Sequence, residues 1–259
     1  MVPELERAIA FEEAVRERCV ERIISFPFGH ALFNDRFPRV WDLNLLRVER
    51  TADVSAEALA AEAERLHGLA GHPHRRVAVL DEQAGAELAP AFRDLGWRQE
   101  RYVLMAYRGP GERRVVTAEV SEIEGAALRP LRELIVREEP WAQDDEVVTA
   151  VLDAGELAAR TGKTRHFAVS VGGKPVSGTS LYSDGETAQV EDVSSHPDYR
   201  GRSYASSVVL RAVQEALGSG HEFVFLLADD EDWPKLLYER LGFEPLGRRW
   251  SFLKTPSTG

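Results

Sequence analysis

A short stretch near residue 200 combines basic side chains with a glycine, at the point where an expected strand gives way to an expected helix. The stretch consists of Arg200, Gly201, Arg202, Ser203, Tyr204 and Ala205. A strand–turn–helix junction aims unpaired backbone N–H groups and the positive end of the helix dipole at one point, which suits a phosphate or pyrophosphate group. Arginine can bind phosphate oxygens through two N–H groups at once. By spacing alone, an ordinary turn with solvated arginines explains the stretch equally well.

Two adjacent carboxylates, Glu191 and Asp192, lie on the strand that leads into this turn. Strand alternation sends their side chains to opposite faces, so at most one of them faces a bound molecule directly. Glu191 is expected on the same face as Val193 and Ser195, which slightly favours it over Asp192. A carboxylate here can accept a proton from an amine through water, or anchor a cationic substrate. The alternative is one partly solvated carboxylate and one paired with an arginine.

Composition limits the classes of protein to which the chain can belong. Its 259 residues suit one large or two modest domains, and the apolar fraction of 44% is ordinary for a packed protein. The formal net charge of −11 argues against a nucleic-acid-binding role and favours cationic substrates. No run approaches the ~20 apolar residues that span a bilayer, so no membrane association is expected.

The cysteine and histidine content bears on location and on metal binding. The single cysteine, Cys19, excludes an internal disulfide, and the first residues lack the character of a secretory signal, so a cytoplasmic location is expected. Cys19 falls on a helix expected over residues 11–24, where a packed side chain is the simplest interpretation. Histidine and cysteine show no metal-ligand spacing, so no metal is expected.

The second half of the chain alternates strand and helix patterns in the order β-α-α-β-β-β-α-β-α-β. Gly172-Gly173 is a strong hairpin signal between two of the strands, and Gly218 and Gly242 are helix stop signals. The strands are expected at residues 115–120, 166–171, 175–182, 187–195, 222–228 and 248–253. The helices are expected at residues 126–137, 144–159, 204–217 and 233–241.

The first half of the chain repeats part of this pattern. A strand candidate at residues 74–80, a helix at 84–94, Leu95-Gly96-Trp97 and a strand at 101–107 keep nearly the register of the segment from His221 to Leu253. Such a repeat indicates duplication of one architecture. A strand at 41–49 and a helix at 55–69 would flank the counterpart of the basic turn. That counterpart, residues 50–54, has no glycine, and Asp53 would repel a phosphate. An unrelated α/β domain with coincidental spacing is the alternative.

The basic turn resembles the acyl-CoA pyrophosphate loop of the GNAT superfamily of N-acetyltransferases, whose pattern is Gln/Arg-x-x-Gly-x-Gly/Ala. Arg200, Ser203 and Ala205 occupy the defined positions, with Ser203 in place of the middle glycine. The backbone N–H survives this replacement, and a serine hydroxyl can cap the first turn of the helix. Residues 233–243 resemble the family's last helix, with its Leu-Tyr-x-x-x-Gly-Phe ending. The order of elements over residues 113–254 is also that of a GNAT domain.

The resemblance implies an α/β (α+β) fold of two tandem GNAT-like domains, each with a mixed, mostly antiparallel sheet flanked by helices. A degenerate domain is expected over residues 1–108 and an acetyltransferase domain over 113–254, with residues 108–112 as the linker. The degenerate domain would shape the acceptor cleft or form the face of a homodimer.

The resemblance also implies the chemistry. The enzyme would transfer an acetyl group from acetyl-CoA to a primary amine of a small molecule by direct attack, with Tyr238 as the general acid. The backbone N–H groups of Val193 and Ser195 would bind the thioester and its pantetheine arm, and Arg200 to Ala205 the pyrophosphate. Two alternatives stay open: a non-catalytic protein that binds or senses acyl-CoA, and an acetyltransferase for protein N-termini or lysines.

Overall fold

The computed structural model of the chain describes residues 2–111 and 118–255. Within these ranges the chain divides into two compact units that interleave along the sequence. Of the described residues, the larger unit takes those within Met1–Val15, Leu104–Ala228 and Asp232–Leu246. The smaller unit takes those within Arg16–Val103, Asp229–Glu231 and Gly247–Gly259.

This division differs from a boundary placed at residues 108–113. The first helix, α1 (Glu4–Cys19), contributes most of its length to the larger unit. The strands β5 (Arg98–Tyr107) and β11 (Phe243–Lys254) each contribute residues to both units. The sequence could not show this interleaving, because a strand pattern does not say which neighbour the strand pairs with.

Three further expectations differ from the structure or lie outside its description. The helix expected over residues 11–24 is α1, which ends at Cys19, and the following isoleucines belong to β1 (Arg22–Phe26). The expected strand 115–120 and the linker 108–112 fall partly on residues 112–117, outside the described residues. Residues 118–120 are not in a strand, and β6 (Ser121–Ile123) follows them.

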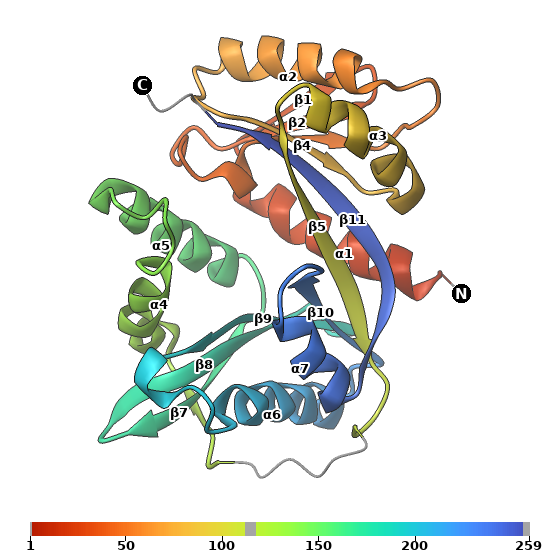
Figure 1. The fold of residues 1–259 in the computed structure, drawn as a ribbon. Helices are drawn as coiled ribbons and strands as arrows, with labels where there is room; N and C mark the ends of the chain where they lie inside the picture. Colours follow the sequence, from red (N-terminus) through yellow and green to blue (C-terminus); the bar gives the residue numbers. More distant parts are fainter. Residues whose placement is uncertain (1, 112–117, 256–259) are drawn as a thin grey trace. The chain divides into compact units, whose positions relative to one another are not determined.

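The smaller unit contains a mixed sheet covered by two helices (Figure 1). Its strands run in the order β1-β2-β3-β4-β11, antiparallel except for the parallel pair β3 and β4, which the helix α2 connects. Its core lies between the sheet and both helices and includes Phe33, Leu59, Phe92 and Phe252. The remaining elements are β2 (Gly29–Phe33), η1 (Trp41–Leu43), β3 (Leu45–Val48), α2 (Ala56–Leu69), β4 (Arg75–Val79) and α3 (Glu82–Asp94).

The larger unit repeats this strand order in β7-β8-β9-β10, with β6 added at the edge beside β7. The parallel pair, β9 and β10, again has a helix, α6, between its strands. The larger unit's elements include η2 (Gly125–Leu128), α4 (Arg129–Val136), α5 (Asp145–Arg160), β7 (Arg165–Val171), β8 (Lys174–Ser183) and β9 (Thr187–Ser195). The elements after these are η3 (Pro197–Tyr199), α6 (Tyr204–Gly218), β10 (Phe223–Asp229) and α7 (Pro234–Leu241). Each unit therefore has a mixed, mostly antiparallel sheet flanked by helices, as predicted.

Helices of the larger unit lie on both faces of its sheet (Figure 1). Ala168 of β7 packs with Leu128 and Leu131, which belong to η2 and α4. The next residue, Val169, packs with Val208 of α6. Because successive strand residues point to opposite faces, α4 and α6 cover opposite faces of this sheet.

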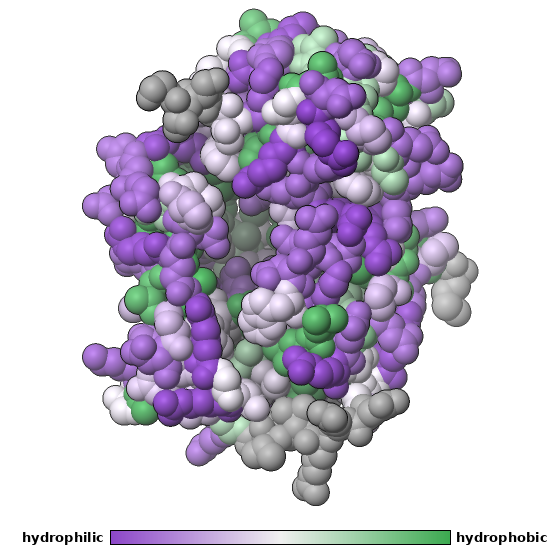
Figure 2. Space-filling view, viewed as in Figure 1, coloured by the Kyte–Doolittle hydropathy of each residue, from purple (hydrophilic) through white to green (hydrophobic). Residues whose placement is uncertain are grey.

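The face of the molecule drawn in Figure 2 is largely polar. On the face drawn in Figure 2, hydrophilic residues dominate and apolar residues are scattered in small groups. Among the described residues, no helix has the length and apolar character that crossing a membrane requires.

Candidate active site

The loop between β9 and α6 has the backbone conformation that a close approach of main chain to a ligand requires. Gly201 and Ser203 both have a positive φ, of 77° and 62°. A positive φ is easy for glycine and unfavourable for serine, so Ser203 occupies a position that suits glycine. The prediction that its hydroxyl caps the helix is wrong: in the part of the chain described, the Ser203 side chain makes no cap bond to α6. The left-handed conformation differs from the extended one in which an N-cap side chain reaches the first turn.

The first turn of α6 consequently keeps backbone N–H groups that no serine hydroxyl occupies. The carbonyl of Ser203 accepts hydrogen bonds from Ser207, from its N at 3.0 Å and its Oγ at 2.9 Å. No acidic residue stands in this turn, within the described residues. The positive end of α6 therefore has the properties of an anion site.

Arg200 and Arg202 flank this end of α6. The guanidinium of Arg200 pairs with Glu138 and donates from Nε to the carbonyl of Ser195 at 3.3 Å. Arg202 donates to the carbonyl of Asp198 at 3.4 Å and lies over the ring of Tyr199, 5.1 Å from its centroid. Both arginines therefore stay near the loop, with exposed side chains. Tyr204, whose ring stacks on Tyr199, and Ala205 begin the helix half-buried.

The strand before the loop separates from its parallel neighbour at the expected place. β9 pairs with β10 from Thr187 opposite Phe223 to Val190 opposite Leu226. Beyond this pair β9 runs on to Ser195 and β10 to Asp229, and the backbone of Val193 and Ser195 lies past the end of the parallel ladder. This is the arrangement in which N–H groups of β9 can reach a bound molecule.

A bulge in β9 overturns the prediction that Glu191 shares a face with Val193 and Ser195. Ser195 pairs with Ser177 of β8 and Glu191 with Ser180, so β9 holds one extra residue between the two pairs. Ser177 and Ser180 are an odd number of residues apart, so they point to opposite faces, and so do their partners. The extra residue lies at Asp192, which has a φ of 54°.

Tyr238 and Glu191 interact electrostatically. Tyr238, on α7, is buried, with 8% of its surface exposed. Burial raises the pKa of its phenol, and the negative charge of Glu191 raises it further. Glu191 in turn accepts a hydrogen bond from the amide of Gln189, which also donates to Glu12 of α1 at 3.1 Å. Glu191 and Tyr238 thus form a carboxylate and a protonated phenol within reach of each other's charge.

Asp192 has a different set of neighbours. Its carboxylate pairs with Arg132 of α4, with 3.2 Å between Oδ2 and Nη2. The same guanidinium donates to Ser180 Oγ at 2.6 Å, and Ser180 Oγ lies 2.9 Å from Nδ1 of His166. Sequence reasoning missed Arg132, Ser180, Gln189 and Glu12, because no short motif links residues that lie on separate elements.

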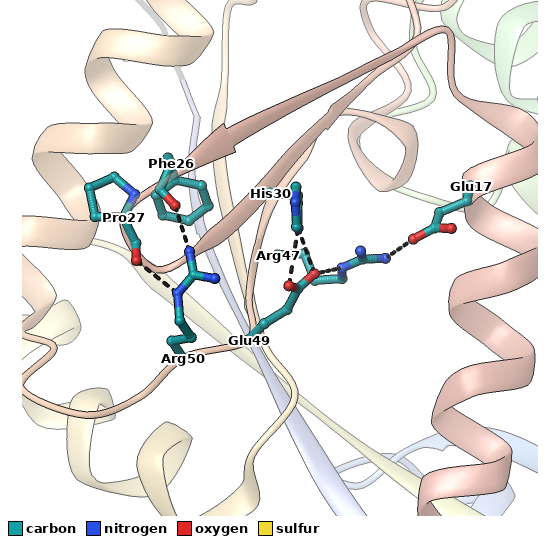
Figure 3. A network of polar contacts seen from close by, with 7 residues as sticks. All are labelled: Glu17, Phe26, Pro27, His30, Arg47, Glu49 and Arg50. Carbon is teal, nitrogen blue, oxygen red and sulfur yellow. Dashed lines mark hydrogen bonds and ion pairs between the residues drawn. The ribbon is translucent and has the colours of Figure 1, made fainter.

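The corresponding turn of the smaller unit has the opposite properties. Ser55 caps α2, its Oγ accepting from Ala58 N at 3.2 Å, and Glu57 adds a negative charge to the first turn. Figure 3 shows Arg50 turned to the carbonyls of Phe26 and Pro27, both at 3.0 Å. This helix end is already satisfied by the protein's own groups, in line with the expectation that the first copy lacks a phosphate loop.

Figure 3 also shows a second polar network, whose members all belong to the smaller unit. Arg47 pairs with Glu17 and Glu49, each at 2.7 Å, and Glu49 also accepts from His30 Nδ1 at 3.0 Å (Figure 3). In the described residues, no group of three or more potential metal-binding side chains has an arrangement that could hold a metal ion.

The mixed sheet with its parallel pair matches the fold of solved GNAT proteins, and a family model matches part of the chain. Residues 128–243 match the model of the acetyltransferase (GNAT) family. Apart from Asp229–Glu231, the matched segment belongs to the larger unit, and it covers the basic loop, Glu191, Asp192 and Tyr238.

Solved structures with this fold extend over both units. A GCN5-related N-acetyltransferase from Kribbella flavida is similar over 100% of this chain and 98% of its own, with a TM-score of 0.65 and 17% identity. A functionally unknown conserved protein from Staphylococcus epidermidis is similar over 92% and 94%, with a TM-score of 0.68 and 13% identity. A tandem GNAT protein from the clavulanic acid biosynthesis pathway covers 82% and 75%, with a TM-score of 0.51 and 15% identity. No curated protein matches the sequence.

Proposed function

We propose that the chain is an acetyl-CoA-dependent N-acetyltransferase, in which the larger unit alone binds the cofactor and transfers its acetyl group to a primary amine. The observation that carries this proposal is the open N-terminus of α6, with Arg200 and Arg202 beside it, directly after the separated end of β9. Main-chain N–H groups, a helix dipole and two arginines match the charge of a pyrophosphate.

Acetyl-CoA supplies a thioester, which an amine can attack directly. The backbone N–H groups of Val193 and Ser195 are the proposed donors to the carbonyl oxygen, which gains negative charge during the attack. The new bond joins the amine nitrogen to the carbonyl carbon, and the carbon–sulfur bond breaks. The products are an amide and free CoA thiol.

Glu191 and Tyr238 are the proton acceptor and the proton donor in this proposal. Glu191 accepts the proton that the amine must lose, directly or through a water molecule. Tyr238 donates its proton to the departing thiolate. Its raised pKa keeps the phenol protonated at neutral pH, so that the donor is present when sulfur leaves. The Glu191 proton then returns to the phenolate through solvent, which restores both groups.

The acceptor is proposed to be a small cationic amine. The net charge of −11 attracts cations over the whole surface, and Glu12 and Glu191 share the amide of Gln189 on the face of the sheet opposite to α6. A carboxylate pair there suits an ammonium group before it loses its proton. A peptide lysine or protein N-terminus is the second candidate acceptor.

The test is release of CoA thiol from acetyl-CoA with a panel of amines, compared with equilibrium binding of acetyl-CoA. Saturable turnover with at least one amine, lost in the Arg200→Met variant at low acetyl-CoA, is the expected result. Tight binding without turnover on small amines, peptides or protein N-termini would support a sensor of acyl-CoA. Turnover with peptides alone would replace the small-molecule acceptor with a protein one.

A further inference from the structure

An ion pair across one face of the larger unit's sheet holds the bulge in β9. Arg132 extends from α4, and its side chain is only 14% exposed. Its Nη2 lies 3.2 Å from Oδ2 of Asp192, the residue at the bulge. Asp192 adopts a left-handed backbone conformation, which a residue with a Cβ avoids unless its surroundings hold it there.

The guanidinium of Arg132 is itself held from a second side. Its Nη2 donates to Ser180 Oγ at 2.6 Å, and the register pairs Ser180 with Glu191, the neighbour of Asp192. Arginine can only donate, so Ser180 Oγ accepts from it and keeps its own proton for Nδ1 of His166 at 2.9 Å. The head of Arg132 thus cannot move without breaking bonds to both β8 and β9.

We propose that Arg132 is a positioning residue, and that Asp192 serves as its anchor in β9 and not as the base. Through this ion pair Arg132 fixes the bulge and so aims the N–H of Val193, the next residue, at the thioester carbonyl. The inference rests on the proposed function, and it leaves Glu191 as the carboxylate that accepts the amine proton. The carboxylate of Asp192 is already engaged by the guanidinium of Arg132.

Charge around the network is consistent with a positioning role. His166 is half-buried behind Ser180, and its pKa lies below the usual histidine range. Burial and the positive charge of Arg132 lower this pKa. The negative charges of Asp192, Glu124 and Glu122 raise it, but by less. At pH 7 the ring of His166 is therefore uncharged.

The test compares Arg132→Met, Asp192→Asn and Asp192→Gly with a matched control, Arg129→Met. Arg129 lies on the same helix and also pairs with carboxylates, Asp153 and Glu156, which both belong to α5. We expect kcat to fall by about 10- to 100-fold in the first three variants, because a shift of about 1 Å in a catalytic donor has such an effect. We expect KM for acetyl-CoA and the shape of the pH–rate profile to stay as in the wild type.

Asp192→Gly separates positioning from mere stability. Glycine accepts the left-handed conformation without strain, which offsets part of the stability lost with the ion pair, so this variant should lose less stability than Arg132→Met while its kcat falls as far. Loss of an acidic pH limb in Asp192→Asn would overturn the inference, because it would show that Asp192 is the base. So would wild-type kcat in Arg132→Met, or an equal loss in Arg129→Met.

Hydrogen exchange tests the tether apart from catalysis. Amides of residues 191–195 should exchange faster in Arg132→Met than in the wild type, and unchanged in Arg129→Met. If exchange is faster in Arg132→Met but the wild type shows no turnover on any amine, the proposed function is removed and the tether stands. Unchanged exchange together with normal wild-type turnover would remove the tether and leave the function standing.

Discussion

Ser203 and Ser55 begin corresponding helices of the two units in opposite ways. Ser55 is extended, and its hydroxyl accepts from the N–H of Ala58 at 3.2 Å. Ser203 has a φ of 62° and, in the described structure, leaves the first turn of α6 without a side-chain cap. One helix end is capped by a side chain of the protein itself, whereas the other is the end that we propose for the pyrophosphate. This difference separates the two copies of the architecture more sharply than the presence or absence of a glycine does.

Replacing Ser203 by glycine should stabilise the protein or leave its stability unchanged. The left-handed conformation costs a residue with a Cβ about 1 kcal/mol, which the added flexibility of glycine partly offsets. Thermal unfolding and acetyl-CoA binding should show no loss in Ser203→Gly. Ser219→Gly is the control, because Ser219 ends the same helix with a φ of −90°. It should destabilise by up to about 1 kcal/mol, and equal loss in both variants would contradict the strain at Ser203.

Tyr238→Phe should lower kcat without changing KM for acetyl-CoA. The variant keeps the ring that packs on Phe243, at 6.2 Å between centroids, and loses only the hydroxyl. We expect a fall of about 10²-fold, in the range of general acid catalysis. Tyr107→Phe is the matched control, since its ring lies 5.3 Å from the same Phe243. Comparable losses in the two variants would argue against the acid role of Tyr238.

The same residue predicts the alkaline limit of the reaction. Burial and Glu191 raise the pKa of Tyr238 above its ordinary value of 10.0, so the phenol stays protonated, and able to donate, at higher pH than an exposed tyrosine. Wild-type kcat should therefore show no loss through tyrosine ionisation up to pH 10. A decline in kcat centred between pH 8 and 9, and absent in Tyr238→Phe, would contradict this prediction. It would mean that the pKa of the Tyr238 phenol lies below the ordinary tyrosine value and not above it.

Glu138 should compete with the cofactor for Arg200. Its carboxylate pairs with the guanidinium that we assign to the pyrophosphate. Glu138→Gln should free Arg200 and tighten acetyl-CoA binding by about two- to five-fold, the size of an exposed ion pair. The neighbouring Glu139→Gln controls for the change in net charge. Weaker binding in Glu138→Gln would mean that this carboxylate instead holds Arg200 in its binding position.

Three buried histidines should make the smaller unit sensitive to acid. The rings of His67, His72 and His74 lie within 5.1 to 5.8 Å of one another. Burial lowers the pKa of His67 to about 2 and that of His74 to about 4, and it also lowers that of His72. The unfolded chain takes up their protons near pH 6.5, so the free energy of unfolding falls as pH drops below 6.5, by about 1 kcal/mol per pH unit and histidine.

Urea unfolding at pH 7 and pH 5 measures this dependence. His67→Phe keeps a ring beside Phe33 and removes one of the protonation sites, so its stability should fall less between the two pH values than that of the wild type. His196→Gln, on the loop before α6, should keep the wild-type dependence. An equal fall in wild type and His67→Phe would show that this histidine does not set the acid response.

The sequence predicted the helices and strands of this fold better than it predicted which strands pair with each other. Regular patterns such as Ser55 before an amphipathic helix, or Gly172-Gly173 between strands, act locally, and α2 and the β7–β8 hairpin form where they indicate. The pairing of Trp250 with Val79 depends on contacts between distant segments, which no local pattern records. For this reason the two consecutive domains predicted from the sequence differ from the two units of the structure, which interleave along the chain.

The candidate site shows the same limit. The basic loop and Tyr238 belong to short motifs, so they could be found from spacing. The bulge at Asp192 breaks the alternation from which the face of Glu191 was predicted, and Asp192 pairs there with Arg132 of α4. Polar contacts of this kind are set by tertiary packing, so only the folded structure could assign Glu191 and Asp192 to different neighbours.

Calorimetric titration of the full chain with acetyl-CoA tests the central claim most directly, that one unit binds the cofactor and the other does not. We predict one binding site per chain, weakened about tenfold or more by Arg200→Met, because a hydrogen bond to a charged group is lost. Arg50→Met, at the corresponding turn of the smaller unit, should bind as the wild type does, since Arg50 bonds to the carbonyls of Phe26 and Pro27. Two sites per chain, no binding, or equal weakening by Arg50→Met would contradict the account.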